Sequence, residues 1–570
     1  MHSVRALLDA AYDCRVKSAD VVTSTFNRAF RQVPIYRLDL EPEVSLTLQA
    51  GAMIAPALAY LQALLVGLAA STALWLWKYR TRSTLPLPPG PKPLPIIGNL
   101  LDMPSKDRAR KFWAIGRTYG DIVYFDVFGQ PMVVINTYDA AVSLLEAKSA
   151  NTSDRPRIVM AELVGLTERV FALMGYGPRW RQQRRTFHEF FQQGAIPQYR
   201  PIFLRQAKRF LQRLLHSPEG FIAHSHLAIG ASIMEVVYGI KVTEGDKYLS
   251  IAEKGADIFS KALAPGRYLV ELFPVLAHLP PWFPGAKFKR DAATWLPDSS
   301  AVHRVPYTTV KCAMAQGTAK PCMTTTLLER AASKGPLSLD EDQLFEDVAG
   351  LAYGAGTDTS YTYLTTFFLA MTIHPDVRRR GQAELDAIVG PERIPAFSDR
   401  QSLPYVNAIV KECLRWHSVL PLGIPHRAIH DDEYNGWRIP AGTILLANAW
   451  AMSRDPAAYP DPDKFIPERF LKDGAIDPTV RDPLKYQLGF GRRICPGLHF
   501  SSEALFIFVS SVLHVFDILP PLGGDGQPIL PDPAFSSGDT MSHPEPFACT
   551  ILPRSAAAEA LLAQLHKDDA

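Results

Sequence analysis

The chain has 570 residues, with 60 lysines and arginines against 57 aspartates and glutamates, for a formal charge of +3. This near balance excludes a nucleic-acid footprint over the whole molecule, so we expect no nucleic-acid partner. Length alone leaves the number of domains open. The six cysteines are scattered along the chain, which excludes a small disulfide scaffold and favours a reducing compartment for the main body.

An uncharged apolar run covers residues 50–77. It is long enough to cross a hydrocarbon core of about 30 Å as a single helix, and it begins too far from Met1 to be a cleaved signal peptide. Three basic residues follow it directly, whereas the nearest charges before it are acidic. The positive-inside rule therefore predicts a single-pass anchor with the bulk of the chain in the cytosol.

The anchor divides a short N-terminal tail, residues 1–49, from the rest of the chain. Residues 78–94 are basic and rich in proline, which predicts a stiff extended connector because proline fixes φ and lacks an amide donor. Residues 95–555 contain no internal repeat and no long low-complexity linker, so we predict one large domain. Residues 556–570 are expected to be a C-terminal tail.

The pattern of the large domain is mainly helical, with a few strands. The longest predicted helix begins near Ser338 and ends near Ile373, since Ser338 and Glu341 form a capping box and Pro375 lies just past its end. Strand-like segments are predicted at residues 122–128, 131–136 and 443–446.

A glycine-rich turn, Leu488–Gly497, presents Cys495 just before an apolar helical stretch. A nearby cation and a helix N-terminus both favour the thiolate, which is the form that binds metal. A dinucleotide loop would need a glycine at Ile494, a zinc site would need further paired ligands, and c-type haem would need two cysteines. The residues alone leave a buried structural cysteine open as the alternative.

This turn resembles the haem-binding signature of the cytochrome P-450 family, which Gly491, Arg493, Cys495 and Gly497 match. The resemblance implies that Cys495 is the axial ligand of a haem b iron and that the two glycines let the backbone approach the flat cofactor. Leu488 stands where the family usually has phenylalanine. This departure concerns the redox tuning of the iron, because burial around the sulfur affects its potential.

Two further segments resemble a buried ion-pair triad of the same family. Glu412 and Arg415 are three residues apart, so a helix places them on one face. Arg469, in the segment Phe465–Phe470, is the third expected member. The resemblance assigns all three to structure, and removing one member would strand a buried charge at a cost of about 3–5 kcal/mol.

The helix predicted over residues 338–373 resembles the family's central helix above the haem. In this resemblance Asp358 and Thr359 form the acid and alcohol pair that guides protons to the oxygen site; taken alone, such a threonine is more often bonded to its own helix. Helix-interior glycines cost about 1 kcal/mol each, so we expect a local reason, namely room for dioxygen and water above the iron. These glycines are Gly350, Gly354 and Gly356.

The resemblance also implies donors for the two haem propionates. Trp180 and Arg184 are four residues apart on one predicted helical face and match a family pair. His426 and Arg493 fall where the family places further partners, although Arg427 could substitute for His426. Four donors around two carboxylates are chemically reasonable.

Together the matching segments cover about residues 85–555 and imply the cytochrome P-450 fold, mainly α with small β-sheets, behind one transmembrane helix. The implied reaction inserts one oxygen atom from dioxygen into a small molecule. Electrons would come from NADPH through a separate reductase, with cytochrome b5 as a second candidate partner. The alternatives are a haem-thiolate isomerase or dehydratase that needs no reductase, and a haem sensor without turnover.

The substrate is expected to be lipophilic. The uncharged segment Val419–Ile424 resembles the family segment beside the haem, and Tyr353 and Ala355 would add a phenol and a small wall. Segments such as Leu279–Gly285 resemble fungal microsomal members, which implies the endoplasmic reticulum membrane and hydroxylation of a terpenoid or polyketide in secondary metabolism. The apolar pair Trp282 and Phe283 could touch lipid or pack inside the domain.

Overall fold

A long central helix and the helices packed around it organise the fold, which we describe from a computed structural model. The structure describes residues 67, 69, 85–536 and 540–569. The predicted tail at 1–49, and the predicted anchor apart from residues 67 and 69, lie outside them. Residues 85–570 form one compact unit.

The α-helices are α3 (Arg108–Tyr119), α4 (Tyr138–Ala141), α5 (Ser149–Thr152), α6 (Val159–Leu163), α7 (Leu166–Arg169), α8 (Pro178–Phe191), α9 (Arg200–His216), α10 (Phe221–Tyr238), α11 (Lys247–Leu263), α12 (Lys287–Ala315), α13 (Met323–Ala332), α14 (Leu339–Ile373), α15 (Pro375–Ile388), α16 (Pro404–Trp416), α17 (Ala449–Ser453), α18 (Leu484–Gln487), α19 (Leu498–Val515) and α20 (Ala556–Asp569). Shorter helical turns are η1 (Leu100–Asp102), the π-helix η2 (Val142–Ala147), η3 (Gln193–Tyr199), η4 (Pro218–Gly220), η5 (Leu269–Glu271), η6 (Pro274–His278), η7 (Phe397–Ser402), η8 (Pro467–Phe470) and η9 (Gly491–Arg493). The strands are β1 (Ile122–Val127), β2 (Gln130–Ile135), β3 (His426–Arg427), β4 (Asp432–Tyr434), β5 (Trp437–Ile439), β6 (Ile444–Ala447), β7 (Leu471–Lys472), β8 (Ala475–Ile476), β9 (Phe516–Leu519) and β10 (Thr550–Pro553).

The central helix α14 begins where the capping box predicts. The Ser338 hydroxyl accepts the N–H of Glu341 at 3.2 Å, and the Glu341 carboxylate accepts the N–H of Ser338 at 3.3 Å. These bonds satisfy two amide groups that a helix start leaves free. The helix ends at Ile373, because Pro375 cannot continue the ladder and instead opens α15.

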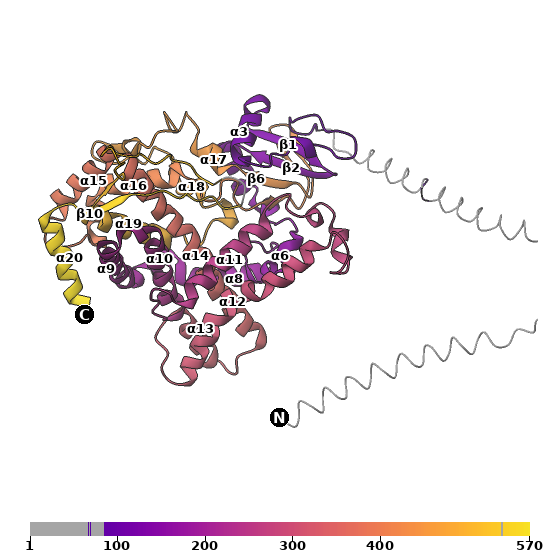
Figure 1. The fold of residues 1–570 in the computed structure, drawn as a ribbon. Helices are drawn as coiled ribbons and strands as arrows, with labels where there is room; N and C mark the ends of the chain where they lie inside the picture. The colour runs from indigo at the N-terminus through magenta and orange to yellow at the C-terminus, as the bar shows by residue number, and fades with distance from the viewer. Residues whose placement is uncertain (1–66, 68, 70–84, 537–539, 570) are drawn as a thin grey trace, which may run out of the picture. The chain divides into compact units, whose positions relative to one another are not determined.

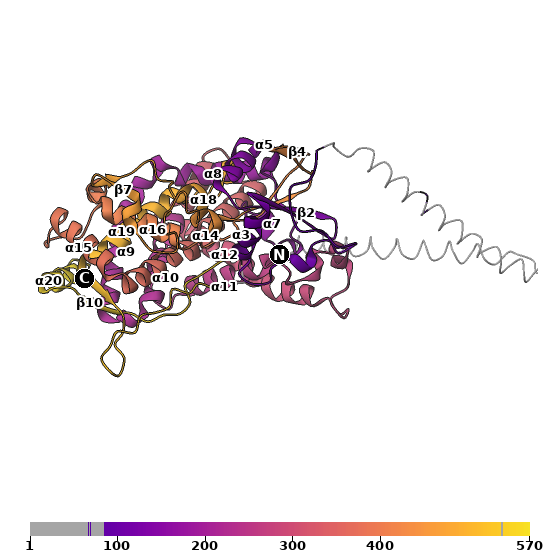
Figure 2. The same cartoon turned by 90° about the horizontal axis from the view of Figure 1, so that it is seen from above.

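The helices α10 and α19 pack against α14 and are apolar around most of their circumference. Both are long and apolar enough to cross a membrane, but most of each helix is buried inside the domain. Core packing therefore accounts for their composition. The main hydrophobic core lies between these three helices and their neighbours (Figures 1 and 2).

The sheet that contains the three predicted strands has the order β1-β2-β6-β3. β1 and β2 are antiparallel, β2 and β6 are parallel, and β3 pairs antiparallel with β6. Each predicted strand lies within one residue of its observed bounds; β1 stops before Phe128, whose φ of 51° begins a turn. Figure 1 shows this sheet beside α3, at one end of the helical body.

The C-terminal segment, predicted as a tail, instead forms the helix α20 and packs against α9 (Figure 1). Leu561, Leu562 and Leu565 are buried, and the Gln212 side chain donates to the carbonyl of Leu565 at 2.9 Å. Apolar residues three and four apart lie on one helical face, so this segment has a stripe that the domain covers.

Candidate functional site

The three predicted triad residues come together in the core. The Glu412 carboxylate accepts from Arg415 at 2.7 and 2.8 Å and from Arg469 at 3.2 Å. The N–H of Ile466 also donates to it at 2.7 Å. Glu412 and Arg415 have no exposed side-chain surface, so these bonds replace the water that both charges lose.

The Cys495 turn is held close to the rest of the domain by backbone contacts. The N–H of Cys495 donates to the carbonyl of Leu488 at 2.7 Å. Gly491 has a φ of +53°, and a Cβ there would lie 2.4 Å from the Leu145 carbonyl oxygen in η2. Only glycine permits this close approach, so Gly491 has a packing role in placing the turn.

The Cys495 sulfur lies just before α19, whose N-cap is Gly497. Burial raises the pKa of the Cys495 thiol, while a hydrogen bond from the Gly497 backbone and the charge of Arg184 lower it. A bound metal ion outweighs these effects, because it deprotonates a coordinating thiol outright. A Cβ at Gly497 would be 3.8 Å from the sulfur, an ordinary contact.

Two predicted donors, Trp180 and Arg184, lie on α8 near this turn. The indole nitrogen of Trp180 is buried and has no hydrogen-bond partner among the described residues. The Arg493 guanidinium lies 4.7 Å from the Trp180 ring centre, which brings the two predicted donors together. Burial lowers the pKa of Arg184, and its attraction to Cys495 opposes this effect. Buried N–H groups without partners are costly, so the site favours an anionic acceptor.

Arg493 shares its donors between the backbone and the site. Its guanidinium donates to the carbonyls of Ser153 at 2.7 Å, Phe171 at 2.9 Å and Met174 at 2.7 Å. A guanidinium has five N–H groups, so two remain for a ligand. Burial lowers the pKa of Arg493 to about 10, and the side chain stays charged at neutral pH.

His426 is buried beside the same cluster, but its donor is already used. Its Nδ1 contacts the Thr152 carbonyl at 2.9 Å, and since a carbonyl only accepts, Nδ1 bears the hydrogen. Burial and the charge of Arg155 hold the pKa of His426 well below its usual range. The neutral ring therefore has an acceptor, not a donor, at Nε2. A propionate could therefore bond to His426 Nε2 only if its carboxyl were protonated and donated the hydrogen bond.

Arg155 is a member of this cluster that sequence reasoning missed. It is buried and donates to the carbonyls of Ala172 at 2.8 Å, and Ile424 and Pro425 at 2.7 Å each. It thus ties the predicted pocket-lining segment to the loop before α8. An isolated arginine before a proline has no spacing that could have marked it.

The acid and alcohol pair lies midway along α14. The Thr359 hydroxyl donates to the carbonyl of Ala355 at 2.9 Å, and the Ala355 side chain is exposed although the helix is central. Burial raises the pKa of Asp358, whereas the nearby His543 lowers it. The helix thus presents Ala355 and Thr359 to accessible space and keeps Asp358 largely covered.

Tyr353, expected beside the iron, lies elsewhere. It is fully buried, and its hydroxyl donates to the Tyr248 carbonyl on α11. Residues two apart on a helix differ by about 200° in direction, so Tyr353 and Ala355 cannot line one wall. The expected phenol is therefore absent from the face that presents Ala355.

The three central-helix glycines serve helix packing rather than space above the iron. A Cβ at Gly350 would lie 2.1 Å from the His303 ring on α12, and one at Gly354 would lie 3.2 Å from Val302. A Cβ at Gly356 would lie 2.2 Å from Ile233 on α10. The prediction of room for dioxygen was wrong for these positions, because their missing side chains face neighbouring helices.

The residues present fit a haem. One thiol stands at a helix N-terminus, and the N–H groups of Trp180, Arg184 and Arg493 are available for carboxylates. In the middle of α14, Ala355 is exposed and Thr359 is partly exposed. A cysteine thiolate would be the ligand of haem-thiolate iron, so these residues suit that cofactor.

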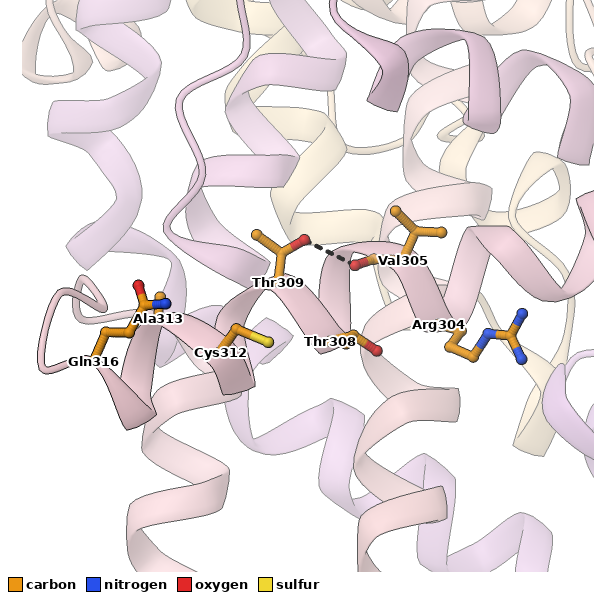
Figure 3. Close-up of a pocket in the computed structure, with 7 residues that line it drawn as sticks. All are labelled: Arg304, Val305, Thr308, Thr309, Cys312, Ala313 and Gln316. Atoms are coloured by element: carbon orange, nitrogen blue, oxygen red, sulfur yellow. Dashed lines mark hydrogen bonds between the residues drawn. The ribbon is translucent and has the colours of Figure 1, made fainter.

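A separate surface groove of about 650 Å³ lies along α12. Figure 3 shows that its seven residues run along one side of that helix, with the Thr309 hydroxyl bonded to the Val305 carbonyl. None of them is a predicted site residue, so this groove is not the candidate active site.

Comparison with known proteins finds relatives over most of the chain. The profile of the cytochrome P-450 family matches residues 88–549. A cytochrome P-450 monooxygenase of Coprinopsis cinerea is 41% identical over 473 residues, which cover 82% of this chain and 89% of the relative. One of Armillaria gallica is 41% identical over 479 residues, covering 82% and 92%. The tryptamine 4-monooxygenase of Psilocybe cyanescens is 38% identical over 465 residues, covering 81% and 91%.

Proposed function

Because the chain belongs to the cytochrome P-450 family and is a monooxygenase of that family, we propose that it hydroxylates a lipophilic product of fungal secondary metabolism, a terpenoid or polyketide. The observation that supports a lipophilic substrate is the segment Val419–Ile424. It is uncharged, and all of it except Val419 is partly exposed. Burying an unpaired ionised group against such a wall would be costly.

Each part of the site has a role in this proposal. Haem bound through Cys495 supplies the activation of dioxygen, with electrons from NADPH through a separate reductase and cytochrome b5 as a second donor. Trp180, Arg184 and Arg493 hold the carboxylates and so orient the cofactor. Asp358 holds a proton at its carboxyl and passes it toward the Thr359 hydroxyl.

The substrate class can be tested by spectral titration of the purified holoenzyme. We expect apolar terpenoids and polyketides to displace iron-bound water, and charged compounds of similar size to bind more weakly. Tryptamine is included among the charged compounds, because its amine is protonated at neutral pH. It is tested because one relative is named for acting on it. A response to tryptamine or to small anions alone would overturn the lipophilic assignment.

The proton role can be tested with Thr359→Ala. We expect normal haem incorporation but a several-fold fall in product per NADPH, with the difference released as hydrogen peroxide, because the alcohol next to the acid is lost. The matched control is Thr372→Ala, since Thr372 makes the same bond to its own helix, to the Phe368 carbonyl at 2.8 Å. Unchanged product per NADPH in Thr359→Ala would remove Thr359 from the mechanism.

We also propose a location at the cytosolic face of the endoplasmic reticulum membrane, supported by exposed apolar side chains of the domain. Trp282 and Val275 are 78% and 71% exposed, and Ile96 is 90% exposed. The Phe128 and Phe273 rings, 4.9 Å apart, join the β1–β2 turn to the loop that follows η5. Such exposed apolar side chains suit contact with a lipid surface.

Deleting residues 1–77 is expected to release much of the protein from membranes while preserving haem binding. The double variant Trp282→Ser, Val275→Ser in this truncated chain should lose the residual binding to vesicles of neutral phospholipid. Ile388→Ser is the control, because Ile388 is also exposed but lies on α15, at the far end of the helical body from β1 and β2 (Figure 1). Protection of the haem domain from protease in sealed microsomes would contradict the cytosolic placement.

A further inference from the structure

A histidine of the C-terminal loop lies against the acid of the central helix. Asp358 is on α14, and His543 lies in the loop between β9 and β10. His543 Nε2 is 3.8 Å from Asp358 Oδ2, a distance too long for a hydrogen bond but short enough for an ion pair. Among the residues that the structure describes, His543 is the only basic side chain that pairs with this carboxylate.

The hydrogen bonds of Thr362 decide which ring nitrogen of His543 bears the hydrogen. The Thr362 hydroxyl donates its single hydrogen to the Asp358 carbonyl at 2.8 Å. Its contact of 2.9 Å with His543 Nδ1 therefore requires that Nδ1 donates. Nε2, which faces the Asp358 carboxylate, has a hydrogen only when the ring is charged. The pair thus has two arrangements, an imidazolium beside a carboxylate and a neutral ring beside a carboxyl.

We infer that His543 and Asp358 share one proton and that His543 returns a proton to Asp358 after Asp358 has passed one toward Thr359. This inference rests on the proposed role of Asp358 and Thr359. The transfer requires Nε2 and Oδ2 to close from 3.8 Å to hydrogen-bond distance. The Nε2–H bond of the imidazolium then breaks and an O–H bond forms at Asp358 Oδ2, with no change in electron count. The His543 side chain is 34% exposed and Asp358 only 14%, so water reaches the ring more readily than the acid.

The charges around the pair favour retention of its proton. Burial raises the pKa of Asp358, and the carboxylate of Glu253 on α11 raises it further. His226 on α10 lies 3.4 Å from Glu253, but burial lowers the pKa of His226 to about 4. It is therefore neutral at pH 7 and leaves the charge of Glu253 uncompensated.

Two aromatic neighbours complete the surroundings of the ring. Tyr361 of α14 stacks on His543 with ring centres 6.1 Å apart, and burial raises the pKa of Tyr361 to about 12, so it stays neutral. Burial also lowers the pKa of His417 to about 3, with a contribution from His543. Neither group competes with Asp358 for the proton near neutral pH.

The loop holds the ring in place independently of its charge. The N–H of His543 donates to the Ser536 hydroxyl at 2.9 Å, and the Ser536 N–H donates to the His543 carbonyl at 2.8 Å. The Ser542 N–H donates to the carbonyl of Val419 at 2.8 Å, and so fixes the loop beside the predicted pocket segment. A proton relay needs such fixed geometry, because proton transfer requires donor and acceptor within hydrogen-bond reach.

His543→Asn separates the relay from a structural role. The asparagine amide can still donate to Thr362 in place of Nδ1–H, but it has no titratable proton. Two readouts are required in the holoenzyme: the carboxyl stretching band of Asp358, identified by its loss in Asp358→Asn, and product per NADPH with an apolar compound that shifts the haem spectrum. His417→Asn is the control, since His417 Nδ1 bonds to Thr366 at 2.8 Å and faces no carboxylate.

We expect the carboxyl band to persist to higher pH in His543→Asn, because the positive partner of Asp358 is gone, and product per NADPH to fall several-fold while peroxide rises. His417→Asn should change neither. If His543→Asn fails to take up haem, His543→Gln provides a second variant without a titratable proton. An unchanged band and unchanged coupling, in an active wild type, would overturn the relay alone; no NADPH-dependent product in the wild type would overturn the proposed function.

Discussion

Replacing Cys495 by alanine is expected to abolish the strongly red-shifted absorption of the ferrous carbon monoxide adduct and all monooxygenase activity. The shift would require a thiolate ligand on the haem iron, and Cys495 is the cysteine that the turn places at the N-terminus of α19. Burial alone raises the pKa of this thiol, so metal binding must supply the deprotonation. Without the sulfur, the turn Leu488–Gly497 contains no other cysteine or histidine.

Cys549→Ala is the matched control for this experiment. Cys549 is also partly covered, and burial raises its pKa to about 12, so it is a poor thiolate. The control should keep both the band and the activity. If Cys495→Ala retained haem together with the shifted band, the ligand assignment would be wrong.

Local signals in the sequence predicted the parts of the fold that depend on neighbouring residues. The capping box at Ser338 and Glu341 placed the start of α14, since both partners lie within one helical turn. Short runs of β-branched, aromatic and other apolar residues placed β1, β2 and β6 within one residue, because these residue types favour strands. The spacing of three residues between Glu412 and Arg415 likewise predicted that both lie on one face of a helix, which is α16.

Features that depend on which neighbour covers a face could not be predicted in this way. The predictions for Tyr353 and Gly350 were wrong, because neighbouring helices cover both positions. Tyr353 contacts α11, and Gly350 lies against α12. Arg155 bonds only to backbone carbonyls of distant segments, which leave no residue-type signal. His543 meets Asp358 across the whole C-terminal third of the chain, and no spacing relates the two.

Glu412→Gln is expected to lower the free energy of unfolding of the haem domain by about 3–5 kcal/mol, because it leaves Arg415 charged and buried without its counter-ion. An amide can still accept from Arg415 through its one oxygen, but it also places an N–H₂ group against the N–H of Ile466, which now donates to the carboxylate at 2.7 Å. The loss should appear as a lower denaturant midpoint and a faster release of haem at fixed temperature, since large cofactor proteins unfold irreversibly.

Two further variants grade the effect. Arg469→Gln should cost less than Glu412→Gln, because the pair between Glu412 and Arg415 stays intact. Arg380→Gln should leave the midpoint unchanged, since Arg380 pairs with Glu468 at the surface, where water screens both charges. If Glu412→Gln were as stable as the wild type, the fold would not depend on the triad. Equal losses in all three variants would instead indicate a general effect of lost charge, independent of burial.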